Sequence, residues 1–138
     1  MLRILLASMI TWLPVNDTDH YIYSSPNNEA SITVPKNAKC PQWWNMALSV
    51  GWSAKHMKML DTIMHRESRC NLYARNRQDP NGGSFGLMQI NGFWKDYCSL
   101  NRKKDLLDPS INLSCALDVF TYAHSRYDNG WGPWREQE

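Results

Sequence analysis

The chain lacks the excess of basic residues that a nucleic-acid-binding domain requires. Its 138 residues include 15 basic and 13 acidic side chains, for a formal net charge of +2. A nucleic-acid footprint needs Lys and Arg gathered on one face, so we expect no nucleic-acid partner. The charge is compatible with an anionic polymer as the substrate. The chain has no internal repeat, and its length suits one domain with a buried core.

Motifs for metals and for common cofactors are also missing. No two cysteines have C-x-x-C spacing, and no H-E-x-x-H pattern occurs. His65 and Glu67 are two positions apart, so a regular helix would point them in different directions. The sequence has no Walker loop and no dinucleotide fingerprint. We therefore predict no metal site and no cofactor.

The apolar run near the N-terminus is too short to cross a bilayer comfortably. Residues 4–13 are mostly apolar and follow the positive charge of Arg3. This pattern is typical of a signal peptide, although no clear small-x-small cleavage site follows. We expect an exported protein, extracellular, periplasmic or virion-associated, with no stable membrane span. An apolar anchor, or a segment packed elsewhere, is the alternative.

The composition divides the chain into an arm and a folded domain. Residues 14–39 are rich in Asn, Ser and Pro, which is typical of a linker or surface arm. Within it, residues 32–34 are a candidate short strand. We therefore expect a signal-like segment plus an arm over residues 1–39, and one folded domain over residues 40–138.

Helical spacing of apolar residues dominates the folded domain. The pattern predicts helices over residues 41–51, from a Ser53 cap to about residue 70, and from Asp108 to about residue 127. Pro109 suits the first turn of the last helix. We predict a mainly α domain, α+β at most, with very little sheet. The apolar face of the last helix is predicted to comprise Leu113, Ala116, Leu117, Phe120, Ala123 and Tyr127.

The cysteines Cys40, Cys70, Cys98 and Cys115 are even in number and widely spread. Two disulfides are typical of an exported protein, and four cysteines allow three pairings. Cys98 precedes a short loop into the last helix, so we favour Cys98–Cys115, which leaves Cys40–Cys70. Four reduced, buried thiols are the alternative.

Glu67 lies on the apolar side of the second predicted helix. Met57, Leu60, Ile63 and Met64 precede it at helical spacing. Burial disfavours the charged form of a carboxyl group and lets it hold a proton near neutral pH. A general acid for glycoside cleavage needs that property. The alternative is an inert, solvated Glu at the helix end, and the periodicity by itself favours this alternative.

The residues around Glu67 form a longer pattern. Glu67-Ser68 is followed by Gly86-Leu87-Met88-Gln89-Ile90-Asn91, and the domain ends in Gly-Trp-Gly-Pro-Trp at residues 130–134. Together these motifs resemble the lysozyme-like superfamily, most closely the SLT-type lytic transglycosylases of bacteria and phages, and next the goose-type lysozymes. The resemblance covers about residues 41–134. It implies a lysozyme-like fold, with peptidoglycan glycan strands as the partner.

The resemblance also implies a reaction, in which Glu67 acts as the general acid and base. The bond cleaved would be the β-1,4 bond between N-acetylmuramic acid and N-acetylglucosamine. If the carboxylate then activates a sugar hydroxyl, the product is a 1,6-anhydro sugar and no second carboxylate is needed. We expect this transglycosylation. Hydrolysis of the goose type, and a wall-binding or structural module without catalysis, are the alternatives.

A second carboxylate is in doubt at the position that c-type lysozymes use. They have an acidic residue two positions before the Gly of the shared run, and here that residue is Ser84. Asp79 is the nearest acidic residue after Glu67. Goose-type enzymes have a supporting Asp in this general region, so Asp79 is a second catalytic candidate. The alternative is a turn-forming Asp before Pro80.

Several polar and aromatic residues are candidates for sugar binding. If residues 84–91 are strand-like, positions 85, 87, 89 and 91 share one face, with position 84 on the other. The alternatives are that the polar side chains satisfy local backbone groups and that the aromatic rings pack in the core. Trp94 and Trp131 are further candidates for sugar stacking. For the oligomeric state, we expect a monomer. The predicted binding residues are Ser84, Gln89, Asn91, Tyr122 and Trp134.

Overall fold

The computed structural model describes residues 22–23 and 32–135, so the apolar segment 4–13 lies outside the described residues. Strands β1, Ile22–Tyr23, and β2, Ile32–Thr33, pair antiparallel. Val34 follows directly and is buried among the core residues of the domain. Val34, which the sequence assigned to the arm, therefore packs in the core of the domain. Among the described helices, none is long and apolar enough to span a membrane.

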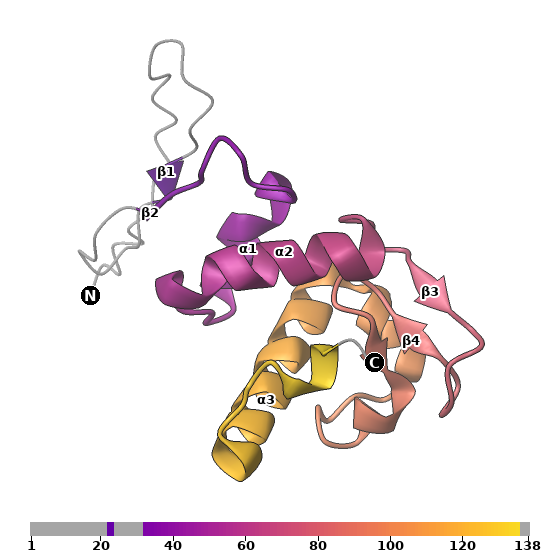
Figure 1. The fold of residues 1–138 in the computed structure, drawn as a ribbon. Coiled ribbons are helices and arrows are strands. Elements are labelled where there is room, and N and C mark those ends of the chain that lie inside the picture. The colour runs from indigo at the N-terminus through magenta and orange to yellow at the C-terminus, as the bar shows by residue number, and fades with distance from the viewer. Residues whose placement is uncertain (1–21, 24–31, 136–138) are drawn as a thin grey trace, which may run out of the picture.

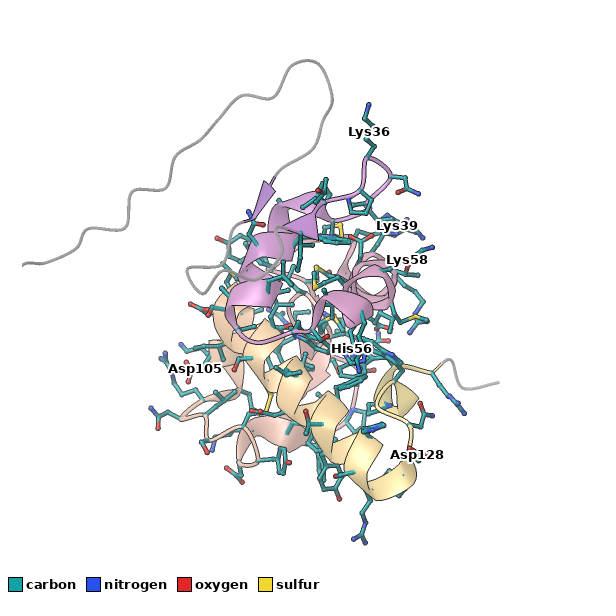
Figure 2. The ribbon with its side chains drawn as sticks, turned by 90° about the vertical axis from the view of Figure 1, so that its left-hand side faces the viewer. Lys36, Lys39, His56, Lys58, Asp105 and Asp128 are labelled. Atoms are coloured by element: carbon teal, nitrogen blue, oxygen red, sulfur yellow. A yellow bond between two sulfur atoms is a disulfide. The ribbon has the colours of Figure 1, made fainter. Side chains whose placement is uncertain are left out.

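Helices form most of the described structure, which confirms the predicted fold class. In Figure 1, α1 and α2 lie across α3, and the C-terminal segment returns from the end of α3 toward the sheet. Figure 2 shows α3 extending from near Asp105, in η4, to Asp128 at its C-terminal end. The α-helices are α1 Trp44–Ser49, α2 Met57–Ser68 and α3 Pro109–Tyr127. The 3-10 helices are η1 Pro41–Trp43, η2 Ala54–His56, η3 Gly92–Lys95, η4 Lys103–Leu107 and η5 Gly132–Trp134.

The helices correct two expectations and confirm two. The second helix was predicted to end at about residue 70, and α2 ends close to it, at Ser68, because Arg69 is left-handed, with φ of 54°. Ser53 precedes η2, yet its side chain makes no capping bond. Asp108 does cap α3, since its Oδ1 accepts from the Ile111 backbone N–H at 3.0 Å. Tyr127 was placed on the apolar face of α3, but it lies past the core and is exposed.

A small antiparallel sheet has the order β3-β4-β5, from Arg75–Asn76, Ser84–Phe85 and Ile90–Asn91. The continuous strand considered for residues 84–91 is wrong, because the chain turns between β4 and β5. Gly86 and Gln89 have φ of 72° and 47°. A β-carbon at position 86 would lie 2.5 Å from the Leu106 carbonyl oxygen, so only glycine fits. The turn places Ser84 opposite Asn91 in the sheet, so the alternation argued from one strand does not apply.

Two disulfides and one buried carboxylate join separate parts of the domain. Cys40–Cys70 and Cys98–Cys115 are bonded, which is the pairing expected from the sequence. Asp61, in the middle of α2, is buried. Its Oδ1 accepts from the Cys40 N–H at 2.8 Å and from Trp44 Nε1 at 2.9 Å, and its Oδ2 accepts from the Lys39 N–H at 2.8 Å. Asp61 is not among the residues predicted from the sequence, although an acid inside an apolar helical stripe was the available signal.

Candidate active site

A cleft of about 570 Å³ lies between the C-terminal end of α2, the three-stranded sheet and η5. In Figure 1 the C-terminal segment returns close to β4, which agrees with this placement. The cleft brings together residues that are distant in sequence. Of the predicted catalytic and binding residues, all except Tyr122 line it: Glu67, Asp79, Ser84, Gln89, Asn91 and Trp134.

Glu67 sits in the last turn of α2, where its side chain is 25% exposed. Met57, Leu60, Ile63 and Met64 are buried as expected, but Glu67 lies in the cleft wall and not inside the core. Arg66 holds it there, because Nε and Nη2 of Arg66 both donate to Glu67 Oε1, at 3.2 and 3.0 Å. The carboxylate is therefore neither core-buried nor freely solvated, which were the two alternatives from the sequence.

Arg66 also joins Glu67 to the C-terminal segment. Its Nη2 donates to the backbone carbonyl of Trp134, and both residues line the cleft. Because the guanidinium binds the Glu67 carboxylate and the Trp134 carbonyl at once, it fixes the end of α2 relative to η5. Arg66 is not among the residues predicted from the sequence. Its position beside the candidate acid was the only signal for it.

Asp79 lines the same cleft, in the turn between β3 and β4. Its Oδ1 accepts a hydrogen bond from Asn76 Nδ2 at 2.9 Å, while Asn76 Oδ1 accepts from the Gln78 N–H at 3.1 Å. These bonds order the turn and the carboxylate together. Asp79 therefore forms local turn contacts, as the alternative of a turn-forming Asp predicted. It also lines the cavity that Glu67 lines.

Asn91 and Ser84 line the cleft through side chains that already have local partners. Asn91 Oδ1 accepts from the Phe93 N–H at 2.9 Å and from Asn81 Nδ2 at 3.1 Å. Its Nδ2 donates to the Pro80 carbonyl at 2.9 Å and to Ser84 Oγ at 3.3 Å. Asn91 thus holds the sheet, the preceding turn and the start of η3 together. Sugar binding by these two side chains stays a prediction.

The side-chain amide nitrogen of Gln89 forms hydrogen bonds to the backbone. Its Nε2 donates to the carbonyls of Ala74 and Gly86, at 3.1 and 3.0 Å. These bonds satisfy local backbone groups, as the alternative interpretation held. Its side-chain oxygen is not needed for them, so the residue retains an acceptor at the wall of the cleft.

The segment between β4 and β5 is fixed from two sides by buried side chains. Trp134 is buried, and its Nε1 donates to the Met88 carbonyl at 2.8 Å. On the other side, Asn112 of α3 accepts from the Met88 N–H at 2.9 Å and donates to the carbonyls of Phe85 and Leu106, both at 2.8 Å. Asn112 is not among the residues predicted from the sequence. Its helical spacing with Ala116 puts an amide on an apolar face, which was the signal for a buried polar contact.

Tyr122 and Trp131 lie away from the cleft. Tyr122 packs edge-to-face on Trp94 and Tyr97, at centroid distances of 5.5 and 5.3 Å. Trp131 stacks on Trp52 at 5.6 Å and lies near His56, which Figure 2 labels beside α3. Burial is the main cause that lowers the pKa of His56, followed by the charges of Lys55 and His124. Of the aromatic candidates, Trp94 and Trp134 line the cleft.

The described residues contain no group of three His, Cys, Asp or Glu side chains placed to hold a metal ion. The titratable side chains in the cleft lining that are candidates for acid–base chemistry are those of Glu67 and Asp79. A carboxyl group can donate or accept a proton, and that of Glu67 lies at the edge of a cavity that hydroxyl, amide and aromatic side chains also line.

The helical fold, the small sheet and the acidic residue at the end of α2 define a lysozyme-like domain. A family model, the transglycosylase SLT domain, matches residues 52–135, which is more than half of the chain. The chain belongs to this family, and the resemblance seen in its motifs is confirmed. Membership implies peptidoglycan as the substrate and a function of the lytic transglycosylase type. Comparisons with curated proteins and with solved structures found no match.

Proposed function

We propose that this protein cleaves the β-1,4 bond between N-acetylmuramic acid and N-acetylglucosamine as a lytic transglycosylase, with Glu67 as the general acid and base. The observation that carries the proposal is the Glu67 carboxyl group in the wall of the cleft, inside the region that matches the family. The presence of Glu67 in the cleft argues against a wall-binding module without catalysis, because loss of catalysis often begins with replacement of the catalytic acid.

The reaction needs one carboxyl group acting twice. In its protonated form, Glu67 gives its proton to the glycosidic oxygen as the bond from that oxygen to C1 of the muramic acid breaks. The resulting carboxylate then takes the proton of the C6 hydroxyl of the same sugar. The freed oxygen bonds to C1 and closes a 1,6-anhydro ring. Glu67 recovers its proton, and no water is consumed.

Arg66 has a positioning role in this scheme. Both of its hydrogen bonds to Glu67 go to Oε1, so Oε2 is the atom left to carry the proton. The same guanidinium binds the Trp134 carbonyl, so the carboxyl orientation is tied to η5, which also lines the cleft. A proton donor held in one orientation loses less entropy on reaching the reactive geometry.

Hydrolysis of the goose type is the second candidate, and Asp79 is the observation that favours it. This carboxylate lines the same cleft as Glu67 and is ordered by Asn76. An inverting hydrolase uses a second carboxylate about 6.5–9.5 Å from the acid to activate water, and a retaining one about 5–5.5 Å away. In either scheme Asp79 would act on the reacting atoms, whereas transglycosylation leaves it without a chemical role.

The products distinguish the two reactions. We expect mass spectrometry of muropeptides released from purified cell walls to show anhydro-muramic acid ends, each lighter by one water than the hydrolytic product. The reason is that Glu67 alone can complete transglycosylation. Muropeptides that carry only ordinary reducing ends would contradict transglycosylation and leave a peptidoglycan hydrolase. Walls incubated without the protein provide the background.

Replacing Asp79 with asparagine is expected to change kcat/KM for wall cleavage by less than about 3-fold, because the amide keeps the acceptor for Asn76 and transglycosylation does not use the charge. If Asp79 activates water, removing it should cost about 10²-fold or more, the usual contribution of a general base. Initial rates on the same wall preparation, compared with wild type, separate these results. A large loss together with reducing-end products would establish the hydrolytic scheme.

The location of the protein follows from the same proposal. Peptidoglycan lies outside the cytoplasm, and two disulfides suit an oxidising compartment. Both observations fit an extracellular or periplasmic protein. We propose export or carriage on a virion, with glycan strands as the partner.

A further inference from the structure

The solvent-facing side of η2 and α2 carries basic side chains and no exposed acidic one. Lys55, Lys58 and Arg69 are exposed along it, and Lys36 and Lys39 extend the same side from the loop after β2. Figure 2 shows Lys36, Lys39 and Lys58 along one edge of the molecule. We call these residues the basic face.

Contacts with α2 fix the loop that contributes Lys39. The Lys39 N–H donates to Asp61 Oδ2 at 2.8 Å, and a disulfide ties the next residue of the loop to Cys70. Lys58 lies about one turn before Asp61 on α2, and Arg69 directly precedes Cys70. Basic residues from two separate segments are therefore held side by side before any partner arrives.

The positive charges of the basic face are not neutralised by acidic side chains in the described part of the chain. None of the ion pairs between described residues includes a residue of this face. The acidic residues of α2 are Asp61, which is buried, and Glu67, which lines the cleft. On another side of the molecule, by contrast, Lys95 binds Asp96 at 2.8 Å. Unpaired like charges repel one another, so the basic face favours an anionic partner.

The basic face and the candidate acid point away from each other. Lys58 and Glu67 are separated by about two and a half turns of α2, which places their side chains on opposite sides of the helix. No residue of the basic face lines the cleft. A partner bound to this face would therefore leave the cleft open to its own substrate.

An apolar side chain lies among these cations. Met59 is 49% exposed and directly follows Lys58, while Lys55 lies about one turn before it. This part of the basic face is the convex outer side of a helix, which suits a broad surface better than a single bound molecule. Lysines around an exposed apolar side chain are typical of a helix that lies on a bilayer, because the apolar group enters the headgroup region and the ammonium groups stay among the phosphates.

We infer that the basic face docks this domain onto an anionic phospholipid surface, with Met59 in the headgroup region and the cleft turned away from the bilayer. Each Lys or Arg close to such a surface raises the binding constant about 5-fold, and clusters of about four to eight attach protein segments to anionic membranes. The inference concerns a surface apart from the cleft, and it does not rest on the proposed reaction.

Sedimentation of the full-length protein with lipid vesicles tests the inference. Vesicles of phosphatidylcholine alone are compared with vesicles of phosphatidylcholine and phosphatidylglycerol in equal parts, at low and at high salt. We expect the partition coefficient to be about 10²-fold or more higher for the anionic vesicles, and this difference to shrink as salt screens the charges. Lys55→Gln combined with Lys58→Gln should lower binding to anionic vesicles about 10- to 30-fold, and Met59→Ala about 3-fold.

A matched pair of cations elsewhere on the protein provides the control. Lys104→Gln combined with Arg126→Gln also removes two exposed positive charges, from η4 and from α3. Figure 2 shows their neighbours Asp105 and Asp128 apart from the labelled lysines of the basic face. This variant should bind anionic vesicles within about 3-fold of wild type, because distant charges are screened. The apolar residues 4–13 are present in every variant, so their contribution is common to all.

Two results of the vesicle assay would overturn the inference. One is equal binding of wild type to neutral and anionic vesicles. The other is an equal loss of binding in the basic-face variant and in the control variant, which would indicate an effect of net charge alone. Equal thermal unfolding midpoints of the variants and wild type show that the fold is preserved.

Two further measurements distinguish a membrane from other anionic partners. If soluble polyphosphate binds the wild type as tightly as anionic vesicles do, and Met59→Ala weakens neither interaction, the face binds anionic polymers and the membrane inference is wrong. Cleavage of soluble glycan strands should be unchanged when Lys55 and Lys58 are replaced, and a loss there would assign the face to substrate binding. Failure of docking leaves the proposed function standing, whereas an inactive wild type that still docks leaves the docking surface standing.

Discussion

Replacing Glu67 with glutamine is expected to reduce peptidoglycan cleavage by about 10²- to 10⁴-fold, the usual contribution of a general acid. Glutamine keeps the size of the side chain and an oxygen that can accept both hydrogen bonds from Arg66. It cannot carry the proton that the leaving oxygen needs. The loss should appear in kcat, because the interaction exists only during the chemical step.

A turbidity assay on purified cell walls measures this loss, with far-UV circular dichroism to check the fold. Asp118→Asn is the matched control, since it also removes one carboxylate but lies on α3 outside the cleft. It should retain wild-type activity. More than about a tenth of the wild-type rate in Glu67→Gln would show that Glu67 is not the general acid.

Inactivity of the wild type would have a different meaning. If wild type and Glu67→Gln are both inactive on several wall types but bind them, the protein is a wall-binding or structural module. The transglycosylase SLT family membership would remain correct, because a fold and its motifs do not by themselves establish catalysis. Wild type and Glu67→Gln must therefore both be assayed for cleavage and for binding to cell walls.

Local signals in the sequence were sufficient to predict much of this fold. Asp108 and Pro109 start α3 because a capping carboxylate and a fixed φ act on the nearest residues only. The pairing of Cys98 with Cys115 followed from a short loop. The position of Glu67 near the end of a helix was predictable for the same reason, since helical periodicity needs no tertiary information.

The cleft could not be predicted from local signals, because it is formed by contacts between residues that are distant along the chain. The turn between β4 and β5 forms because Gly86 and Gln89 adopt positive φ while Asn112 and Trp134 bind its backbone. Periodicity cannot reveal a turn of this kind, so the strand argument put Ser84 on the wrong face. Arg66 was missed for the same reason, because its partner Trp134 is far along the chain.

The aromatic residues show a further limit of composition. The seven tryptophans suggested both core packing and sugar stacking. In the structure, Trp52 and Trp131 stack on each other, whereas Trp94 orders a group of exposed rings. The outer rings of that group are Phe93 and two tyrosines, which a count of tryptophans cannot identify. Which rings are exposed depends on the fold, so composition cannot identify them.

Replacing Asn112 with alanine is expected to destabilise the protein by about 3–5 kcal/mol. Asn112 is fully buried, and its amide satisfies the Met88 N–H and the carbonyls of Phe85 and Leu106. Alanine would leave these three backbone groups unsatisfied, at about 1–3 kcal/mol each. The loss would also release the turn between β4 and β5, so cleavage activity should fall with stability.

Urea unfolding, monitored by tryptophan fluorescence, gives the change as a shift in midpoint at constant slope. Asn101→Ala is the control, because Asn101 is exposed and should change the free energy of unfolding by no more than about 0.5 kcal/mol. Asn112→Asp is a second variant of nearly the same size. Its carboxylate replaces the donor that faces two carbonyl oxygens, so it should be at least as destabilising as alanine. A loss below about 1 kcal/mol in Asn112→Ala would show that water or a rearranged turn satisfies these groups, and that Asn112 does not hold the turn between β4 and β5.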